Sequence, residues 1–347
     1  MRKLYFIYSA LVLIGSVSNF RSQDHHLTQF YTTPTLFNPA TAGVSNTDSR
    51  FVLNYKNQWR SVVTPYNTFA FAYDSKIYTN KNRKDNKKGG LIGYGINAFQ
   101  DKAGLSKLTT NQVNLNISYS LFLNNRNSIS AGFVAGFFQK SLRLNNLKWD
   151  SQFNGKTYDS GLPTKETAID QSLYGADIGC GLVYKTNQIV KGYELEVGGS
   201  LLHLNKPNIS FYDSRATGGF KYVGHAQLSY KLNSKMRLLP SALYSLQNKQ
   251  QEVIAGANLK YFLNETSDEE IASATSLLSP AISGGLFYRH KDAIAVVGGF
   301  DYNQNLTIGI SYDVNISKLR SATNLKGGFE ISLIYTQRKH SKIRTLY

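Results

Sequence analysis

The 347-residue sequence is poor in cysteine and proline, with one and seven residues, and it has no long apolar run after residue 22. One cysteine, Cys180, cannot form an internal disulfide or a cysteine-based zinc site. Without about 18 consecutive apolar residues, a bundle of membrane-spanning helices is excluded. Cys180 lies in an alternating apolar segment, and we predict that this small residue is buried or faces lipid. The abundant residues, 23 Tyr and 28 Gly, favour a large β-structure over a helical enzyme.

Motifs for catalysis and cofactor binding are also missing from the sequence. It contains no HExxH, no GxSxG and no phosphate-binding glycine loop, and its six histidines form no spaced metal set. Ser200 and His203 are the only local pair worth nominating as catalytic residues. They are three positions apart, which places them on opposite faces of a strand. We therefore predict no enzyme, no cofactor and no metal site.

The first 22 residues have the pattern of a cleaved secretory signal peptide. A basic start, Arg2 and Lys3, precedes a short apolar core that is too short for a good membrane anchor. Cleavage leaves 36 basic against 22 acidic residues, so the net charge falls from +17 to +14. For an exported protein, this excess favours anionic lipid headgroups, including lipopolysaccharide, or an acidic protein partner, and not nucleic acid.

Period-two alternation dominates the chain after residue 50. The segment 306–316 alternates six apolar residues with Thr307, Gly309, Ser311, Asp313 and Asn315, so one face of the strand is apolar and the other polar. A soluble sandwich or a transmembrane barrel would explain this pattern. Soluble strands average about 5–6 residues, whereas tilted membrane strands need about 9–11. The length of 306–316 and several longer segments therefore favours an all-β, antiparallel, up-and-down transmembrane barrel.

The alternation predicts about fourteen strands. They cover residues 50–59, 66–78, 89–100, 108–123, 127–144, 171–186, 192–204, 219–232, 236–247, 251–263, 277–290, 292–303, 305–316 and 327–336. An even count is typical of bacterial outer-membrane barrels, with short periplasmic turns and long extracellular loops. The tight connections 124–126, 233–235 and 304 are predicted to be periplasmic, although 79–88 and 264–276 break that pattern. The long connections 145–170, 205–218 and 317–326 are predicted to be extracellular.

Residues 23–49 do not alternate, and they contain Pro34, Pro39 and Gly43, which are typical of turns. A barrel of this size has an open lumen unless something fills it. We expect this segment to plug the lumen or cap its periplasmic mouth, with 50–336 forming the barrel and 337–347 a basic tail. The alternative, an exported tail without fixed contacts, is disfavoured by its apolar residues, Phe30, Tyr31, Leu36 and Phe37.

Several motifs together resemble the PorP/SprF family of outer-membrane proteins of the Bacteroidota type IX secretion system. They are Gln23–Asp24, Thr28–Tyr31, Asn38–Gly43 (NPATAG), Tyr55–Trp59 (YKNQW), Pro65–Asp74, Ser200–Pro207, Asp301–Tyr302, Ile310–Ile316, Leu319–Thr323 and Glu330–Leu333. The resemblance covers essentially the whole chain after residue 22. The chain departs from the family pattern in its basic tail, which makes Tyr335, and not only Tyr347, a candidate for the terminal aromatic residue that the assembly machinery reads.

The resemblance implies a non-enzymatic barrel that supports export and surface anchoring of a partner, such as a large adhesin with a type B C-terminal domain. One branch of the family serves gliding motility, and another is a general component of the translocon with its periplasmic and lipoprotein parts. A core component contacting the periplasmic ring or motor, and a passive pore or transporter, are the alternative functions.

One set of residues is predicted to bind a partner, and a second set is predicted to have structural roles. Since aromatics and Arg are enriched at interface hot spots, the long loops nominate Trp149, Phe211, Tyr212, Arg320 and Ser321 as partner contacts. Each of these residues has an alternative role, either in an aromatic girdle at the membrane interface or in packing within its loop. Arg320 has the further alternative of an ion pair with Asp313 or Glu330. The structural motif of the plug and the first strand comprises Asn38, Pro39, Gly43, Asn57, Gln58 and Trp59.

Overall fold

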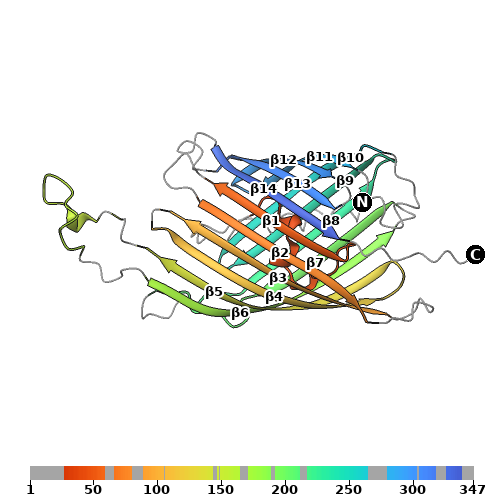
Figure 1. Ribbon diagram of the computed structural model, residues 1–347, viewed down its shortest axis with the longest axis horizontal. Helices are drawn as coiled ribbons and strands as arrows, with labels where there is room; N and C mark the ends of the chain where they lie inside the picture. Colours follow the sequence, from red (N-terminus) through yellow and green to blue (C-terminus); the bar gives the residue numbers. More distant parts are fainter. Residues whose placement is uncertain are drawn as a thin grey trace, which may run out of the picture.

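The computed structural model forms a closed barrel of antiparallel strands, in which each strand pairs with its neighbours in sequence order (Figure 1). It describes residues 27–58, 66–79, 89–104, 106–143, 147, 149–164, 171–188, 192–211, 217–264, 280–302, 305–317 and 326–337. The predicted signal peptide and nearly all of the basic tail lie outside these residues. None of the helices described is long and apolar enough to cross a membrane.

Within the described residues there are fourteen strands, which confirms the predicted barrel. They are β1 Ser49–Gln58, β2 Tyr66–Tyr78, β3 Gly90–Ala103, β4 Leu108–Phe122, β5 Asn127–Leu142, β6 Gln171–Gln188, β7 Tyr193–Leu202, β8 Lys221–Lys231, β9 Met236–Gln247, β10 Gln250–Phe262, β11 Ala281–Arg289, β12 Ala293–Tyr302, β13 Leu306–Asn315 and β14 Lys326–Gln337. The predicted bounds differ from these by at most four residues. Pairing of β1 with β14, from Ser49↔Gln337 to Gln58↔Gly328, closes the barrel.

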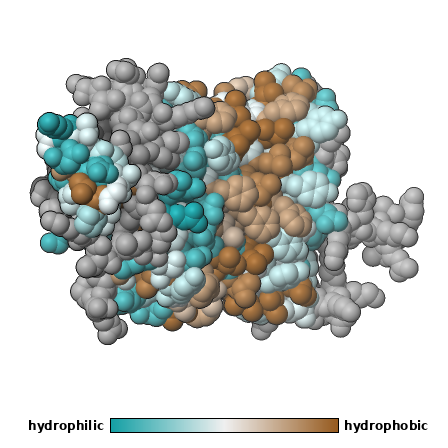
Figure 2. Space-filling model, turned by 60° about the vertical axis from the view of Figure 1, so that its left-hand side comes forward, coloured by the Kyte–Doolittle hydropathy of each residue, from teal (hydrophilic) through white to brown (hydrophobic). Residues whose placement is uncertain are grey.

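The alternation of side chains divides the barrel into an apolar outer face and a polar inner face. In β4, Leu115 and Ile117 are 63% and 57% exposed, whereas Asn116 and Ser118, which alternate with them, are buried. Figure 2 shows such apolar side chains gathered in a broad band over the outside of the barrel. Cys180 is exposed as well, on the outer face of β6. An outer face of this kind is the surface that a membrane barrel turns to lipid.

The two ends of the barrel differ in their connections. At one end, the turn end, β1 begins, β14 ends, and short turns join β4 to β5 and β8 to β9. At the opposite end, the loop end, β5 leads through a long connection to β6 and β7 through another to β8. Part of the first connection, residues 149–164, contains the short 3-10 helix η4 (Asp150–Gln152) and extends away from the barrel (Figure 1).

Candidate functional site

Residues 27–48, here called the lumenal segment, lie inside the barrel. Figure 1 shows them at its centre, coloured red, as three short 3-10 helices, η1 (Phe30–Thr32), η2 (Pro34–Leu36) and η3 (Pro39–Thr41). Pro34 and Pro39 start η2 and η3, where a missing N–H costs nothing and a fixed φ favours the turn. Asn38 caps η3, because its Oδ1 accepts a hydrogen bond from the N–H of Ala40 at 3.0 Å.

Polar side chains of the barrel wall bond to the backbone of the lumenal segment. Asn97 Nδ2 donates to the carbonyl of Thr35 at 3.0 Å, and Ser118 Oγ to that of Ala42 at 2.7 Å. From another part of the wall, Ser200 Oγ donates to the carbonyl of Phe37 at 2.5 Å. Hydrogen bonds of the lumenal segment reach β1, β2, β3, β4, β6, β7, β8, β11, β13 and β14. The segment therefore crosses the lumen from wall to wall.

Glycines stand in the wall where the lumenal segment approaches most closely. A Cβ added to Gly93 would lie 2.0 Å from the carbonyl oxygen of Ala42, and one added to Gly132 would lie 2.4 Å from the nitrogen of Ala40. A Cβ on Gly181 would lie 2.0 Å from Oδ1 of Asn38. Glycine in a strand interior often marks such a close approach of another backbone. The inner wall is therefore complementary in shape to the lumenal segment.

Apolar residues of the lumenal segment form a core with the wall. Leu27, Phe30, Leu36 and Phe37 are buried in one cluster with wall residues that include Ile254 and Phe287. Tyr31 stacks on Phe287 with ring centroids 5.4 Å apart. A large barrel with a polar inner face has few places to bury apolar side chains, so this cluster fixes the segment.

The nominated plug residues take structural positions in this arrangement. Asn38 Nδ2 donates to the carbonyls of Leu182 at 3.0 Å and Gly199 at 3.2 Å, which joins β6 and β7. Gly43 has φ +68°, where glycine is favoured, and its N–H donates to Asp74 Oδ2 at 3.1 Å. The NPATAG motif, with its turn residues, was the signal for both.

A buried ion cluster, here called the loop-end ion cluster, joins the lumenal segment to the wall near the loop end. Lys56 Nζ lies 3.1 Å from Asp313 Oδ2 and 3.7 Å from Glu330 Oε2, and Arg289 Nη2 lies 3.0 Å from Asp313 Oδ2. The side chains of Lys56, Asp313 and Glu330 are each 1% exposed. The cluster consists of Lys56, Arg289, Asp313 and Glu330, and Arg289 forms a further ion pair with the partly exposed Asp292.

The carboxylates of this cluster also hold the lumenal segment directly. The N–H groups of Thr28 and Gln29 donate to Glu330 at 2.7 and 3.0 Å, and Thr28 Oγ1 donates to Asp313 at 2.8 Å. Buried carboxylates with this many partners are fully satisfied. The sequence nominated Asp313 and Glu330 only as partners for Arg320, which lies outside the described residues. Lys56 and Arg289 were missed, although Lys56 occupies an inward position of the YKNQW motif.

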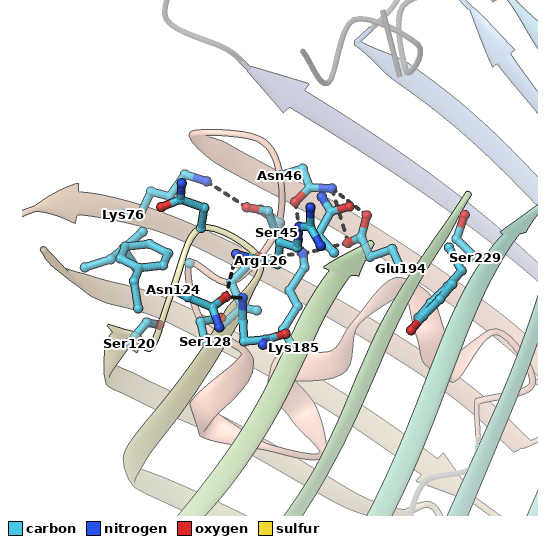
Figure 3. Close-up of a pocket in the computed structure, with 18 of the residues that line it drawn as sticks. Ser45, Asn46, Lys76, Ser120, Asn124, Arg126, Ser128, Lys185, Glu194 and Ser229 are labelled. Atoms are coloured by element: carbon cyan, nitrogen blue, oxygen red, sulfur yellow. Dashed lines mark hydrogen bonds and ion pairs between the residues drawn. The ribbon is translucent and has the colours of Figure 1, made fainter. Parts of the chain in front are cut away.

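At the turn end, a cavity of about 530 Å³, here called the turn-end pocket, lies between the lumenal segment and the wall (Figure 3). Ser45 and Asn46 of the segment form one side of it. Lys185 Nζ lies 2.8 Å from Glu194 and donates to the carbonyl of Val44 at 3.1 Å. The lining includes five cations and one carboxylate: Lys76, Arg126, Lys185, Arg237, Lys260 and Glu194.

The structure does not bring the nominated partner contacts together. Trp149, which precedes η4, and Phe211 are both half-buried and lie in separate connections. Tyr212, Arg320, Ser321 and Trp59 lie outside the described residues. At the end of β1, Asn57 Nδ2 donates to Asn67 at 2.5 Å, and Gln58 pairs in register with Tyr66.

The nominated pair Ser200 and His203 is separated by its own hydrogen bonds. Ser200 bonds to the lumenal segment, as described above, whereas His203 Nδ1 pairs with Asp177 Oδ1 at 2.9 Å. The described part of the chain contains no group of three His, Cys, Asp or Glu residues that could hold a metal.

Sequence and structure comparisons provide one family match. The model of the type IX secretion system membrane protein PorP/SprF matches residues 19–335. No curated protein matches the chain. Among solved structures, a Pseudomonas aeruginosa FadL homologue is 10% identical over 86% of this chain and 92% of its own, with a TM-score of 0.48. BamA from Haemophilus ducreyi, lacking POTRA domains 1–3, is 10% identical over 84% and 71%, with a TM-score of 0.42.

Proposed function

The chain belongs to the PorP/SprF family of type IX secretion system membrane proteins, and we propose that it is a plugged outer-membrane anchor for a secreted surface protein. The family and the barrel place it in the outer membrane as a secretion protein. In the finer part of the proposal, the barrel holds the C-terminal domain of a partner, a large adhesin with a type B domain, at the cell surface.

The occupied lumen carries this proposal. The lumenal segment bonds to strands all round the barrel, and wall glycines leave no clearance where it passes. On its loop-end side, beside Leu36, Pro39 and His203, the described residues leave a cavity of about 30 Å³. A folded cargo cannot pass a lumen filled in this way, and the described residues narrow the passage for a small solute. A holding function is therefore better supported than a passive pore or a transporter.

The long connection at the loop end supports a docking role. Residues 149–164 hold their own shape, because Gln152 Nε2 donates to the carbonyl of Leu162 at 3.0 Å and Phe153 pairs with Tyr158 in a β-bridge. Phe153 and Tyr158 remain 57% and 39% exposed. Exposed aromatics on an ordered loop are well suited to a protein interface. In the outer membrane, long loops are extracellular, which is where a surface protein would dock.

The proposal is tested by recovering the tagged barrel from its native host in mild detergent and identifying co-purified proteins by mass spectrometry. We expect a large exported protein with a C-terminal sorting domain in near-equal amount. Replacing 145–170 by a short Gly-Ser linker, or Trp149 and Phe153 by Ala, should abolish its recovery while the barrel keeps its heat-modifiable gel mobility. Full recovery with the linker variant would move the docking site elsewhere.

Conductance in a planar bilayer tests the plug separately. The intact protein is expected to show no stable open level, and deletion of 23–49 should produce one. Conductance of the intact protein equal to that of the deletion variant would contradict the plugged barrel and restore the pore function.

A further inference from the structure

We propose that the outer face of β3–β6 binds the headgroup of a phosphorylated glycolipid at the loop end of the barrel. In an outer-membrane barrel the end with the long loops faces the cell surface, so this face meets the outer leaflet. Lipopolysaccharide, which the basic composition suggests as a partner in general terms, is a lipid of this kind. The inference needs the orientation of the barrel but not the secreted partner proposed above, so either proposal can fail alone.

A row of side-chain hydrogen bonds, here called the amide ladder, crosses four strands on this face. Gln100 Nε2 donates to Asn111 Oδ1 at 2.8 Å, and Asn111 Nδ2 donates in turn to Gln139 Oε1 at 3.5 Å. Gln139 Nε2 then donates to the hydroxyl of Tyr174 at 3.2 Å. In the strand registers each of these residues is directly opposite the next. The row therefore spans three strand spacings of about 4.8 Å each.

The amide ladder keeps hydrogen-bonding groups for a ligand. A side-chain amide has two N–H hydrogens and a carbonyl oxygen with two lone pairs. Each amide nitrogen uses one hydrogen within the ladder, and the hydroxyl of Tyr174 accepts a bond and keeps its own hydrogen. Gln100 and Tyr174, at the two ends of the row, are exposed. Because the mutual bonds hold the side chains in place, the row presents preorganised donors and acceptors to the hydroxyl groups of a sugar.

The amide ladder lies at the loop-end boundary of the apolar band. One two-residue step toward the turn end, Val113 and Phe137 are exposed on the same face, and Phe137 stacks on Tyr174 with ring centroids 6.1 Å apart. One step toward the loop end, Lys102 is exposed beside Gln100 on the outer face of β3. An ammonium group binds phosphate as a point charge. The acyl chains, the sugar and a phosphate of one lipid would meet these three layers in order.

The other flank of the barrel has a different boundary. Tyr288 and Ile294 are the last outward residues of β11 and β12 at the loop end, and both are exposed, so the apolar band there runs to the strand ends. β4, β5 and β6 have 15, 16 and 18 residues, whereas β11 and β12 have 9 and 10. In Figure 1, β5 and β6 reach further toward the loop end. An aromatic girdle suffices at a membrane interface, so the additional amides favour a bound headgroup on the long strands.

Native mass spectrometry of the full chain in detergent micelles tests the proposal. The probe is bisphosphorylated lipid A, and phosphatidylglycerol, which has acyl chains and a phosphate but no sugar ring, is the control lipid. We expect saturable binding of lipid A and weaker binding of phosphatidylglycerol. The double variant N111L/Q139L should weaken lipid A binding by about tenfold. The single variant Q139L, which breaks the row near its centre, gives the same test with a smaller change.

Two further variants separate the parts of the site. Q251L is the matched control, because Gln251 is exposed on the outer face of β10 at the loop end, opposite Leu246 and away from the amide ladder. It should leave lipid A binding unchanged. K102Q should weaken the binding of lipid A but not that of its dephosphorylated form, which would assign the phosphate to Lys102.

Three results would overturn the proposal. Equal binding of phosphatidylglycerol and lipid A would show that this flank accepts any lipid. Unchanged lipid A binding in both N111L/Q139L and Q139L, with heat-modifiable mobility intact, would remove the amide ladder from the site. A dimer of the chain that N111L/Q139L separates, with no lipid A bound, would assign the flank to a second copy of the barrel.

Discussion

The lumenal segment is held by charged residues at both of its ends, and the two sets differ in balance and in exposure. At the loop end, two cations and two carboxylates are buried and bond to Thr28 and Gln29. At the turn end, five cations and one carboxylate surround an open pocket beside Ser45 and Asn46. Both sets use strand residues of the inner face and backbone groups of the same short segment.

The difference shows how one type of interaction serves two purposes. A buried charge without a partner costs several kcal/mol, so the loop-end ion cluster must be complete within the chain. Charges that line an open pocket remain partly hydrated, so each ion pair there contributes less to stability. The loop-end ion cluster fixes the segment, whereas the charges at the turn end line a pocket that stays open.

The largest effect is expected where the complete cluster is broken. The variant K56M leaves the buried carboxylates of Asp313 and Glu330 with one cation fewer, which should lower the free energy of unfolding by about 3–5 kcal/mol. Urea unfolding in detergent, followed by heat-modifiable mobility, measures this loss. The matched turn-end variant K185M removes a partly exposed partner and should cost about 1 kcal/mol or less. An equal loss of unfolding free energy in K56M and K185M would show that the two ends do not differ in how strongly their ion pairs stabilise the barrel.

A smaller effect is expected where the lumenal segment meets the wall between these ends. In G132A the new Cβ would lie 2.4 Å from the backbone nitrogen of Ala40, and neither β5 nor the lumenal segment can relieve this contact by a small shift. Overpacking of this kind costs about 1–3 kcal/mol. The control is G224A, because a Cβ there meets nothing within 4 Å. If both variants unfold at the same urea concentration, the wall is not fitted to the segment.

The smallest effect concerns salt. Salt screens buried ion pairs little. It weakens exposed ion pairs, because the Debye length of the solution falls from about 10 Å at 0.1 M to about 3 Å at 1 M salt. The stability difference between the native protein and K56M should therefore be the same at both concentrations. The difference for K185M should shrink. An equal salt response at both ends would show that water reaches the loop-end ion cluster.

The strands and their faces could be predicted from the sequence because each depends on local alternation. The segment 306–316 indicates a two-faced strand without reference to any other part of the chain, and β13 lies there. The proline and the glycine of NPATAG likewise predicted turns instead of a strand. The partner of an inward charge is not local. Lys56 and Glu330 lie far apart in sequence, and register across the closing pair β1–β14 sets them opposite each other.

The site residues show the same limit. The sequence placed function in loop aromatics, because composition identifies exposed loops and aromatic hot spots. The turn-end pocket instead arises from Arg237 and Lys260, which alternate in strands like many other residues and meet only through register. Trp149 was nominated from its loop, but the exposed Phe153 and Tyr158 near it in sequence are paired by a β-bridge that no local pattern indicated.

The position of the lumenal segment also constrains how the protein is made. Thr28 bonds to Glu330, 302 residues later, and Ser332 bonds to Gln29, 303 residues earlier. Since the wall glycines bring the segment into close contact with the wall, we expect β1 and β14 to join after the segment is in place. In that order the barrel wraps round its own early residues and closes with its lumen already filled.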